Sequence, residues 1–223
     1  VKRILKASAR TLGRQVTQKK ALLADDLMRL VDQIDINTLR GARDKAMLLL
    51  GFAGGFRRSE VVNLCYHDLT FIDHHLHIRL RKSKTDQEQR GLDKPIFGEI
   101  NSIYCPVQAV KHWLSQSGIK SGHIFRRISK ADRINLYKNQ ALSSVAYVNQ
   151  LKHYAEQAGL DSSALAGHSL RSGFVTSAAM NGQDVLQIAD ITKQDIRTVQ
   201  RYMRKAQQFE QHAGEGLLKS RKN

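Results

Sequence analysis

Hydrophobic residues recur at helical spacing along most of the chain. After Asp25 the apolar positions follow the three-to-four-residue interval of an amphipathic helix. A second and more apolar helix is predicted in "NTLRGARDKAMLLLGFAGG", with Asn37 as its cap and Gly54-Gly55 as its end. A short helix is predicted in "FRRSEVVNL", residues 56–64. Helical spacing then returns in the second half of the chain, over residues 106–117, 141–158, 169–180, 185–191 and 195–206, with Gly182 as a helix stop.

Between these helical regions, residues 69–97 follow a period of two. Leu69 and Phe71 alternate with polar residues before "DHH", and Leu76, Ile78 and Leu80 do so after it. A third strand-like run, "LDKPIF", follows the hairpin. The predicted fold class is therefore mainly α-helical, with one small three-stranded antiparallel sheet.

The charge of the chain indicates a polyanionic partner. Its 223 residues contain 36 Lys and Arg against 20 Asp and Glu, a formal net charge of +16. A large positive surplus on a globular chain most often serves to neutralise a polyphosphate, so a nucleic acid is the expected partner. The longest apolar run, residues 46–56, is interrupted by three glycines and is too short to span a bilayer. No membrane association is expected.

No cofactor is expected from the sequence. The two cysteines, Cys65 and Cys105, are too few for a disulfide framework and are predicted to be buried thiols in a reducing compartment. Four histidines around the hairpin match no common zinc spacing, and no cysteine joins them: His67, His74, His75 and His77. The "GFAGGF" stretch lacks the Gly-Lys-Ser/Thr ending of a phosphate loop.

Arginines in both halves of the chain are suited to hold a phosphodiester. In "AGHSLRSGF", residues 166–174, His168 and Arg171 are three residues apart and share a helix face. In "GFRRSE", Arg57 is the candidate, with Glu60 placed to orient its guanidinium. A guanidinium stays charged and presents a planar fork of donors that matches phosphate oxygens. Taken alone, each arginine is as compatible with an ordinary cap or ion pair.

Metal-independent chemistry on a phosphodiester also needs a nucleophile and a proton donor. Tyr202 in "TVQRYMR" is the candidate nucleophile, although Ile196, Val199 and Met203 beside it also allow a packing role. Lys84 in "RKSKTDQ", at the hairpin turn, is the candidate acid, and a simple contact to the DNA backbone is its alternative.

As an ordered set, "GFRRSE", the hairpin "SKT", "HSLRSGF" and Tyr202 resemble the tyrosine recombinases, also called phage integrases, over residues 21–206. The resemblance implies the DNA breaking-rejoining fold that these enzymes share with type IB topoisomerases. It implies that Arg57 and Arg171 clamp the scissile phosphate and that His168 acts as an acid, a base or an orienting group. Tyr202 would form a 3′-phosphotyrosyl link, and Lys84 would protonate the leaving 5′ oxygen. Because the link conserves the phosphodiester energy, neither metal nor ATP is required.

One position departs from the family pattern. Where the family usually carries His, sometimes Trp, this chain has Lys193, and Thr192 precedes it in place of Gly. A lysine still donates a hydrogen bond to a phosphate oxygen and adds a fixed positive charge. Lys193 is therefore counted with the candidate catalytic residues.

The resemblance also predicts the domain organisation. Residues 1–20 carry seven Lys or Arg and no acidic residue, and are expected to be a basic linker from an N-terminal core-binding domain. Residues 21–206 would be the catalytic domain. Residues 207–223 would be a tail, in which "QQFEQHAGEGLL" docks on a neighbouring protomer of a homotetramer on double-stranded DNA, the partner that the resemblance implies. The expected location is the cytoplasm, on the nucleoid, for a chain encoded by a bacterium or phage.

Three functions remain open from the sequence. The first is a site-specific recombinase. The second is a catalytically weakened DNA-binding accessory protein of recombinase descent, which the departure at Lys193 keeps under consideration. The third is a topoisomerase-like enzyme that relaxes DNA. All three bind DNA in a salt-sensitive way, so covalent linkage and strand exchange, not affinity, separate them.

Overall fold

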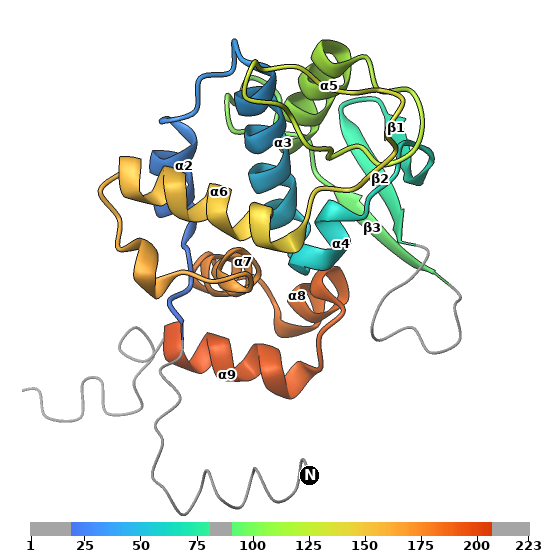
Figure 1. Ribbon diagram of the computed structural model, residues 1–223. Helices are drawn as coiled ribbons and strands as arrows, with labels where there is room; N and C mark the ends of the chain where they lie inside the picture. Colours follow the sequence, from blue (N-terminus) through green and yellow to red (C-terminus); the bar gives the residue numbers. More distant parts are fainter. Residues whose placement is uncertain (1–18, 81–90, 207–223) are drawn as a thin grey trace, which may run out of the picture.

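The computed structural model describes residues 19–80 and 91–206 of the chain (Figure 1). In chain order the elements are α2 (Ala24–Val31), α3 (Leu39–Ala53), α4 (Arg58–Val62), η1 (Tyr66–Asp68), β1 (Leu69–Ile72), β2 (His75–Leu80), β3 (Leu92–Ile96), α5 (Pro106–Ser117), α6 (Ser144–Gln157), η2 (Ser162–Ala164), α7 (Ser169–Met180), α8 (Val185–Thr192) and α9 (Ile196–Ala206). This order confirms the predicted fold class. None of the described helices is both long and apolar enough to cross a membrane.

The sheet has the predicted antiparallel topology. Its strand order is β1-β2-β3, with Leu69 opposite Ile78 and Leu76 opposite Ile96. Along β2 the residues that face the core alternate with more exposed ones, and Leu80 completes this inner face. The period of two in the sequence therefore corresponds to one buried face, as predicted.

The helix ends differ from the predicted ones by a few residues. Thr38, not Asn37, caps α3, because its side chain accepts a hydrogen bond from the Gly41 N–H. Asn37 instead donates to Asp35 through its backbone and side-chain amides. At α6, Ser143 accepts from the Ala146 N–H, so that helix begins at Ser144 and not at residue 141. The N-cap residue is thus the one whose side chain accepts a hydrogen bond from an unpaired N–H of the first helical turn.

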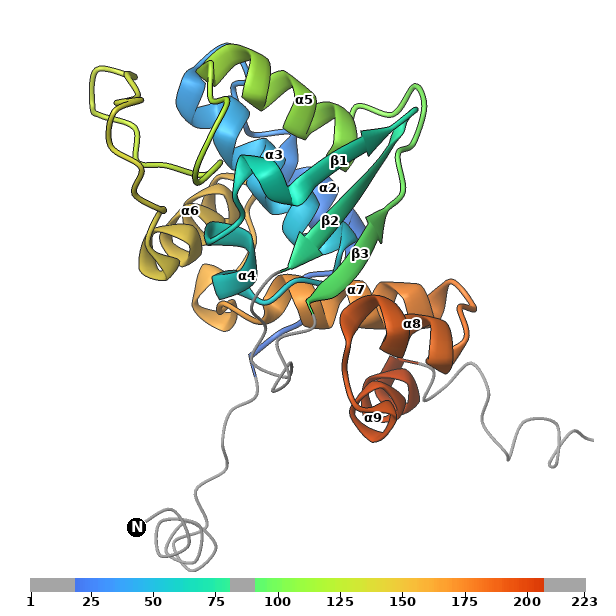
Figure 2. The same cartoon turned by 90° about the vertical axis from the view of Figure 1, so that its right-hand side faces the viewer.

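Two hydrophobic clusters divide the helices into two groups. The larger cluster joins α2, α3, α5 and α6 to the sheet, with Trp113 fully buried in it. The smaller cluster contains Val175, Ile188 and Val199 and joins α7, α8 and α9. Figures 1 and 2 show these last three helices together on one side of the molecule. Since α3 packs against both α5 and α7, it connects the two groups.

The predicted boundary between linker and domain falls at the edge of the described residues. The Lys20 N–H donates to the Ala164 carbonyl at 2.8 Å, and the Lys19 ammonium donates to the Ser163 carbonyl at 2.8 Å. These two residues of the predicted linker are therefore already attached to the folded part. The rest of that segment, and the predicted tail over 207–223, lie outside the described residues.

Candidate active site

Most of the residues selected from the sequence line one cavity. Its volume is about 290 Å³. The lining comes from the start of α4, the start of α7, the turn after α8, and α9: Arg57, His168, Arg171, Ser172, Lys193, Gln194, Asp195, Thr198 and Tyr202. Five of the six predicted catalytic residues are thus brought together from segments far apart in the sequence. The sixth, Lys84, lies outside the described residues.

Arg57 is held in place by Glu60. One guanidinium nitrogen, Nη1, donates to Glu60 Oε1 at 2.6 Å, and the Arg57 backbone N–H donates to Glu60 Oε2 at 2.8 Å. Arg57 is also the N-cap residue of α4, so the carboxylate holds both the side chain and the helix start. The contact expected between these residues is therefore present. The neighbouring Arg58 is exposed and does not line the cavity.

Arg171 is the most deeply placed cation of the cavity, with only 4% of its surface exposed. Its Nη1 donates to the Gly55 carbonyl at 2.5 Å, and its Nη2 donates to the Thr192 carbonyl at 2.6 Å. Burial and the nearby Arg57 guanidinium lower the pKa of Arg171 to about 10, so it remains charged at neutral pH. Two backbone carbonyls from different segments therefore fix the plane of this fork before any ligand arrives.

His168 and Arg171 share the beginning of α7, as the sequence predicts. His168 is the N-cap residue of that helix. Its carbonyl accepts from both the backbone N–H and the hydroxyl of Ser172, at 2.9 Å each. The histidine is thereby positioned by the helix start, and its ring lines the same cavity as Arg171.

Lys193 follows the last turn of α8 in a left-handed conformation, with φ of +51°. Its ammonium donates to Asp190 Oδ1 at 2.5 Å. Since the Asp190 side chain is 75% exposed, a phosphate in the cavity could compete for this ammonium. The preceding Thr192 is buried, and its hydroxyl donates to the Ile188 carbonyl at 2.7 Å.

Tyr202 reaches the cavity from α9. Its ring is half-buried and packs beside the small hydrophobic cluster of α7, α8 and α9, while the residue also lines the cavity. The packing role and the chemical role considered from the sequence are therefore compatible. Tyr202 also lies near enough to Arg171 to favour the charged form of its guanidinium, by raising the pKa of that group.

Several polar residues in or beside the cavity have no role in the sequence analysis, among them Gln194 and Lys94. Gln194 lines the cavity, and its Oε1 is buried without a hydrogen-bond partner among the described residues. Lys94 on β3 does not line the cavity and is 1% exposed, and its ammonium donates to the Gly54 and Ile191 carbonyls. The strand alternation was the available signal for Lys94, because it shares the inner face of β3 with Ile96. No sequence signal distinguishes Gln194.

The cysteine and histidine expectations need two corrections. Cys105 is buried as predicted, but Cys65 is only half-buried. Cys65 also lies beside one of the hairpin histidines, since its thiol, the His67 imidazole and the Asp68 carboxylate have atoms within 4.8 Å of one another. Asp68 already pairs with His67 at 3.2 Å and accepts from the Cys65 N–H at 2.9 Å. These contacts account for the cluster by themselves.

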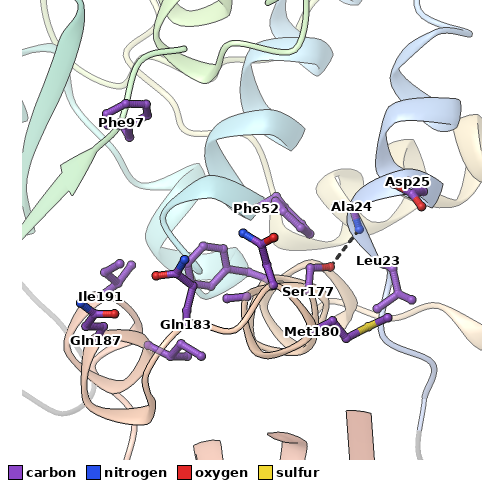
Figure 3. A pocket seen from close by; sticks show the side chains of 14 residues that line it. Leu23, Ala24, Asp25, Phe52, Phe97, Ser177, Met180, Gln183, Gln187 and Ile191 are labelled. Atoms are coloured by element: carbon purple, nitrogen blue, oxygen red, sulfur yellow. Dashed lines mark hydrogen bonds between the residues drawn. The ribbon is translucent and has the colours of Figure 1, made fainter. Parts of the chain in front are cut away.

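A larger and more apolar groove lies on the opposite side of α7. Its volume is about 900 Å³. Figure 3 shows Phe52 and Phe97 on one side of it, Met180 on another, and the hydrogen bond from the Ala24 N–H to the Ser177 hydroxyl at its edge. Phe97 and Met180 are substantially exposed there. This groove contains none of the predicted catalytic residues.

Comparison with known proteins indicates one family. Residues 20–208 match the family model described as "Phage integrase family". An "Integrase/recombinase xerD homolog" of Selenomonas ruminantium is 38% identical over 214 residues, which cover 96% of this chain and 62% of that protein. "Tyrosine recombinase XerD" of Proteus mirabilis is 31% identical over 163 residues, which cover 72% of this chain and 47% of that protein. The chain thus spans about half to two thirds of the length of these relatives.

Solved structures show the same fold. A post-cleavage complex of the XerH site-specific recombinase with a palindromic difH substrate superposes with a TM-score of 0.67 at 18% identity, over 86% of this chain and 51% of that one. The XerA recombinase superposes with a TM-score of 0.62 at 18% identity, over 89% of this chain and 66% of that one. At this identity the likeness concerns the arrangement of helices and sheet.

Proposed function

This chain belongs to the phage integrase family, the tyrosine recombinases, and from that premise we propose that it is the catalytic part of a site-specific DNA recombinase. The observation that carries the proposal is the single cavity lined by Arg57, His168, Arg171, Lys193 and Tyr202. These five side chains combine a phenolic nucleophile with three cations and an imidazole. That combination suits transfer of a phosphodiester.

The cations of the cavity are suited to the transition state more than to the ground state. A pentavalent phosphorus carries extra negative charge on its oxygens, and fixed donors stabilise that charge without reorganising. Arg57 is oriented by Glu60, and Arg171 is oriented by the carbonyls of Gly55 and Thr192. Both guanidinium groups are therefore set in place before DNA binds.

The proposed reaction exchanges one phosphoester for another. The Tyr202 oxygen attacks the scissile phosphorus and loses its proton, and the bond from phosphorus to the 5′ oxygen breaks. The 5′ oxygen takes up a proton, for which Lys84 is the proposed donor by family resemblance. In the reverse step a 5′ hydroxyl attacks the phosphotyrosine and releases Tyr202. His168 is the proposed acid, base or orienting group for the tyrosine proton.

We further propose that the protein acts as a homotetramer through its tail. Residues 207–218 of a neighbouring protomer are the proposed occupant of the apolar groove in Figure 3. The tail follows directly from α9, which packs on α7 and α8, and it contains Phe209, Leu217 and Leu218. The groove offers exposed apolar side chains of matching chemistry. The proposed place of action is the bacterial cytoplasm, with residues 1–20 linking to a DNA-binding domain.

Introducing a charge into the groove is expected to prevent this assembly. Met180→Lys in the full chain would place an ammonium where the apolar tail docks, so the protein should bind DNA without forming tetramers. Analytical ultracentrifugation on DNA that carries paired sites measures the difference. Leu186→Lys, also exposed on this group of helices but outside the groove, is the control. Unchanged tetramers in Met180→Lys would contradict tail docking in this groove.

The test of the proposed function is covalent trapping on nicked DNA that carries the candidate site. On such DNA the short fragment that carries the new 5′ hydroxyl diffuses away, so the phosphotyrosyl adduct should accumulate and migrate as a shifted band on a denaturing gel. The absence of an adduct on DNA that the chain demonstrably binds would contradict the proposal. Adduct formation with relaxation of supercoiled DNA, but without exchange between duplexes, would indicate a topoisomerase-like enzyme instead.

One observation favours a weakened enzyme as the second candidate function. The Lys193 ammonium is paired with Asp190, so the residue at the variable family position is not presented solely to the cavity. The variant Lys193→His in the same assay separates the two candidates. An adduct formed by Lys193→His but not by the parent chain would identify a DNA-binding accessory protein of recombinase descent. Comparable adducts from both would show that Lys193 supports the reaction.

A further inference from the structure

Lys94 is a buried cation that the proposed reaction does not use. It lies on the inner face of β3, is 1% exposed, and does not line the active-site cavity. An unpaired ammonium at such a depth is strongly disfavoured, so its contacts indicate why the position tolerates a lysine. Its two hydrogen-bond acceptors lie on the chain segments that lead to Arg57 and Lys193 of the cavity.

The Lys94 ammonium joins the ends of two helices. Its Nζ donates to the Gly54 carbonyl and to the Ile191 carbonyl, at 2.6 Å each. Gly54 is the C-cap residue of α3, and Ile191 lies in the last turn of α8. Helix C-termini carry unpaired carbonyls and partial negative charge, which a cation stabilises. The ring of Phe56 lies on another side, with its centroid 4.7 Å from Nζ.

Arg171 makes a second bridge between the same two segments. It binds the carbonyls of Gly55 and Thr192, which are the residues directly after the two that Lys94 binds. Each bridged segment leads at once into the cavity, the first to Arg57 and the second to Lys193. The two cations together therefore set the distance between the two halves of the cavity.

We propose that Lys94 is a positioning residue, which binds the end of α8 to the end of α3 and thereby holds Lys193 at the cavity opposite Arg57. The proposal rests on the proposed function only in assigning a catalytic consequence to this placement. Lys94 itself touches neither DNA nor the reacting atoms. Its effect passes through the last turn of α8 to Lys193, which follows that turn directly.

The charged residues around Lys94, several of which line the cavity, affect its protonation. Burial lowers its pKa to about 7 from the ordinary 10.5. Charged groups of α4, α7 and the end of α8 face it, of which Glu60 raises the pKa and Arg171, Arg57 and Lys193 lower it. A phosphodiester bound among those cations would favour the charged form of Lys94. A neutral amine keeps two N–H donors but loses the charge that strengthens both bonds.

The positioning role predicts local loosening without global destabilisation in Lys94→Met. The pKa of Lys94 is lower in the folded protein than in the unfolded chain. Burial of its charge therefore lowers the free energy of unfolding by the full amount below pH 7. This cost disappears as the pH rises from about 7 to 10.5. Below pH 7 the variant should therefore melt at the same temperature as the parent or higher. A fall in melting temperature at pH 6 would show that Lys94 mainly supports the fold.

Hydrogen exchange measures the local effect directly and needs no DNA. In Lys94→Met at pH 6.5, the amides of Lys193 and Gln194, which donate to Asp190 and Ala189, should exchange about tenfold faster than in the parent. Amides of α5 should not change. Lys94→Gln, which keeps two donors without charge, should show a smaller increase. Lys45→Met, at a partly buried lysine whose pKa burial also lowers, is the matched control. Equal exchange in all four proteins would overturn the proposal.

A double-mutant cycle on the trapping rate tests the catalytic consequence. Lys94→Met should slow adduct formation about tenfold in the parent, but less than about threefold in a Lys193→Ala background, because the residue it positions is already missing. An equal loss in both backgrounds would contradict action through Lys193. If the parent chain forms no adduct, the proposed function fails, whereas the exchange experiment still decides whether Lys94 holds the end of α8.

Discussion

Tyr202→Phe is expected to reduce covalent attachment to DNA by at least about 10³-fold, because the variant keeps the ring but lacks the oxygen that would attack phosphorus. The ring packs beside Val199 and the rest of the small cluster, so phenylalanine should preserve the fold and the binding of DNA. The measurement is the amount of adduct on nicked DNA at saturating protein, resolved on a denaturing gel.

Tyr137→Phe provides the control for that experiment. Tyr137 is fully exposed and lies away from the cavity, and its loss of a hydroxyl is chemically identical. The control should form adduct at the rate of the parent chain. Persistence of the adduct in Tyr202→Phe would require another nucleophile, and the proposed role of Tyr202 would be wrong.

Arg171→Lys is expected to slow adduct formation about 10²- to 10³-fold while DNA affinity changes only a few-fold. The substitution keeps the charge, and therefore most of the long-range attraction to phosphate. A single ammonium cannot bind the Gly55 and Thr192 carbonyls and also present a planar pair of donors to a phosphate. Single-turnover trapping measures the rate, and a filter-binding titration measures the affinity.

Arg58→Lys is the matched control, and it also tests which arginine of "GFRRSE" belongs to the cavity. Arg58 is exposed and does not line the cavity, so its variant should react within about threefold of the parent. A large rate loss in Arg58→Lys together with a small one in Arg57→Lys would move this half of the proposed phosphate clamp from Arg57 to Arg58.

The secondary structure was predictable because its signals are local. Alternation in Leu76, Ile78 and Leu80 predicts a strand with one buried face, and the structure buries that face. Helix ends were less predictable, because Asn and Thr are both favoured residue types at the N-cap position, and Asn37 and Thr38 are adjacent. Asn37 donates instead to Asp35, which leaves Thr38 to accept from the Gly41 N–H.

The candidate site residues were selected from short motifs, and the structure brings five of them to one cavity. His168 and Arg171 share a helix start in the sequence pattern and in the structure. Cys65 illustrates the limit of that reasoning. His67 lies near Cys65 in the sequence. The Cys65 thiol also contacts the His123 ring at 3.6 Å, however, and no local pattern predicts a contact between residues 58 positions apart.

Local patterns in the sequence predict the fold class and the family, and they select the candidate cationic and phenolic side chains, because periodicity and motif spacing are encoded over short stretches. The way in which those side chains are held depends on contacts between distant segments. The Lys94 bonds to Gly54 and Ile191 span 40 and 97 positions, and the Arg171 bond to Gly55 spans 116. Such contacts depend on where separate helices end in space, and that position follows from the packing of the whole core.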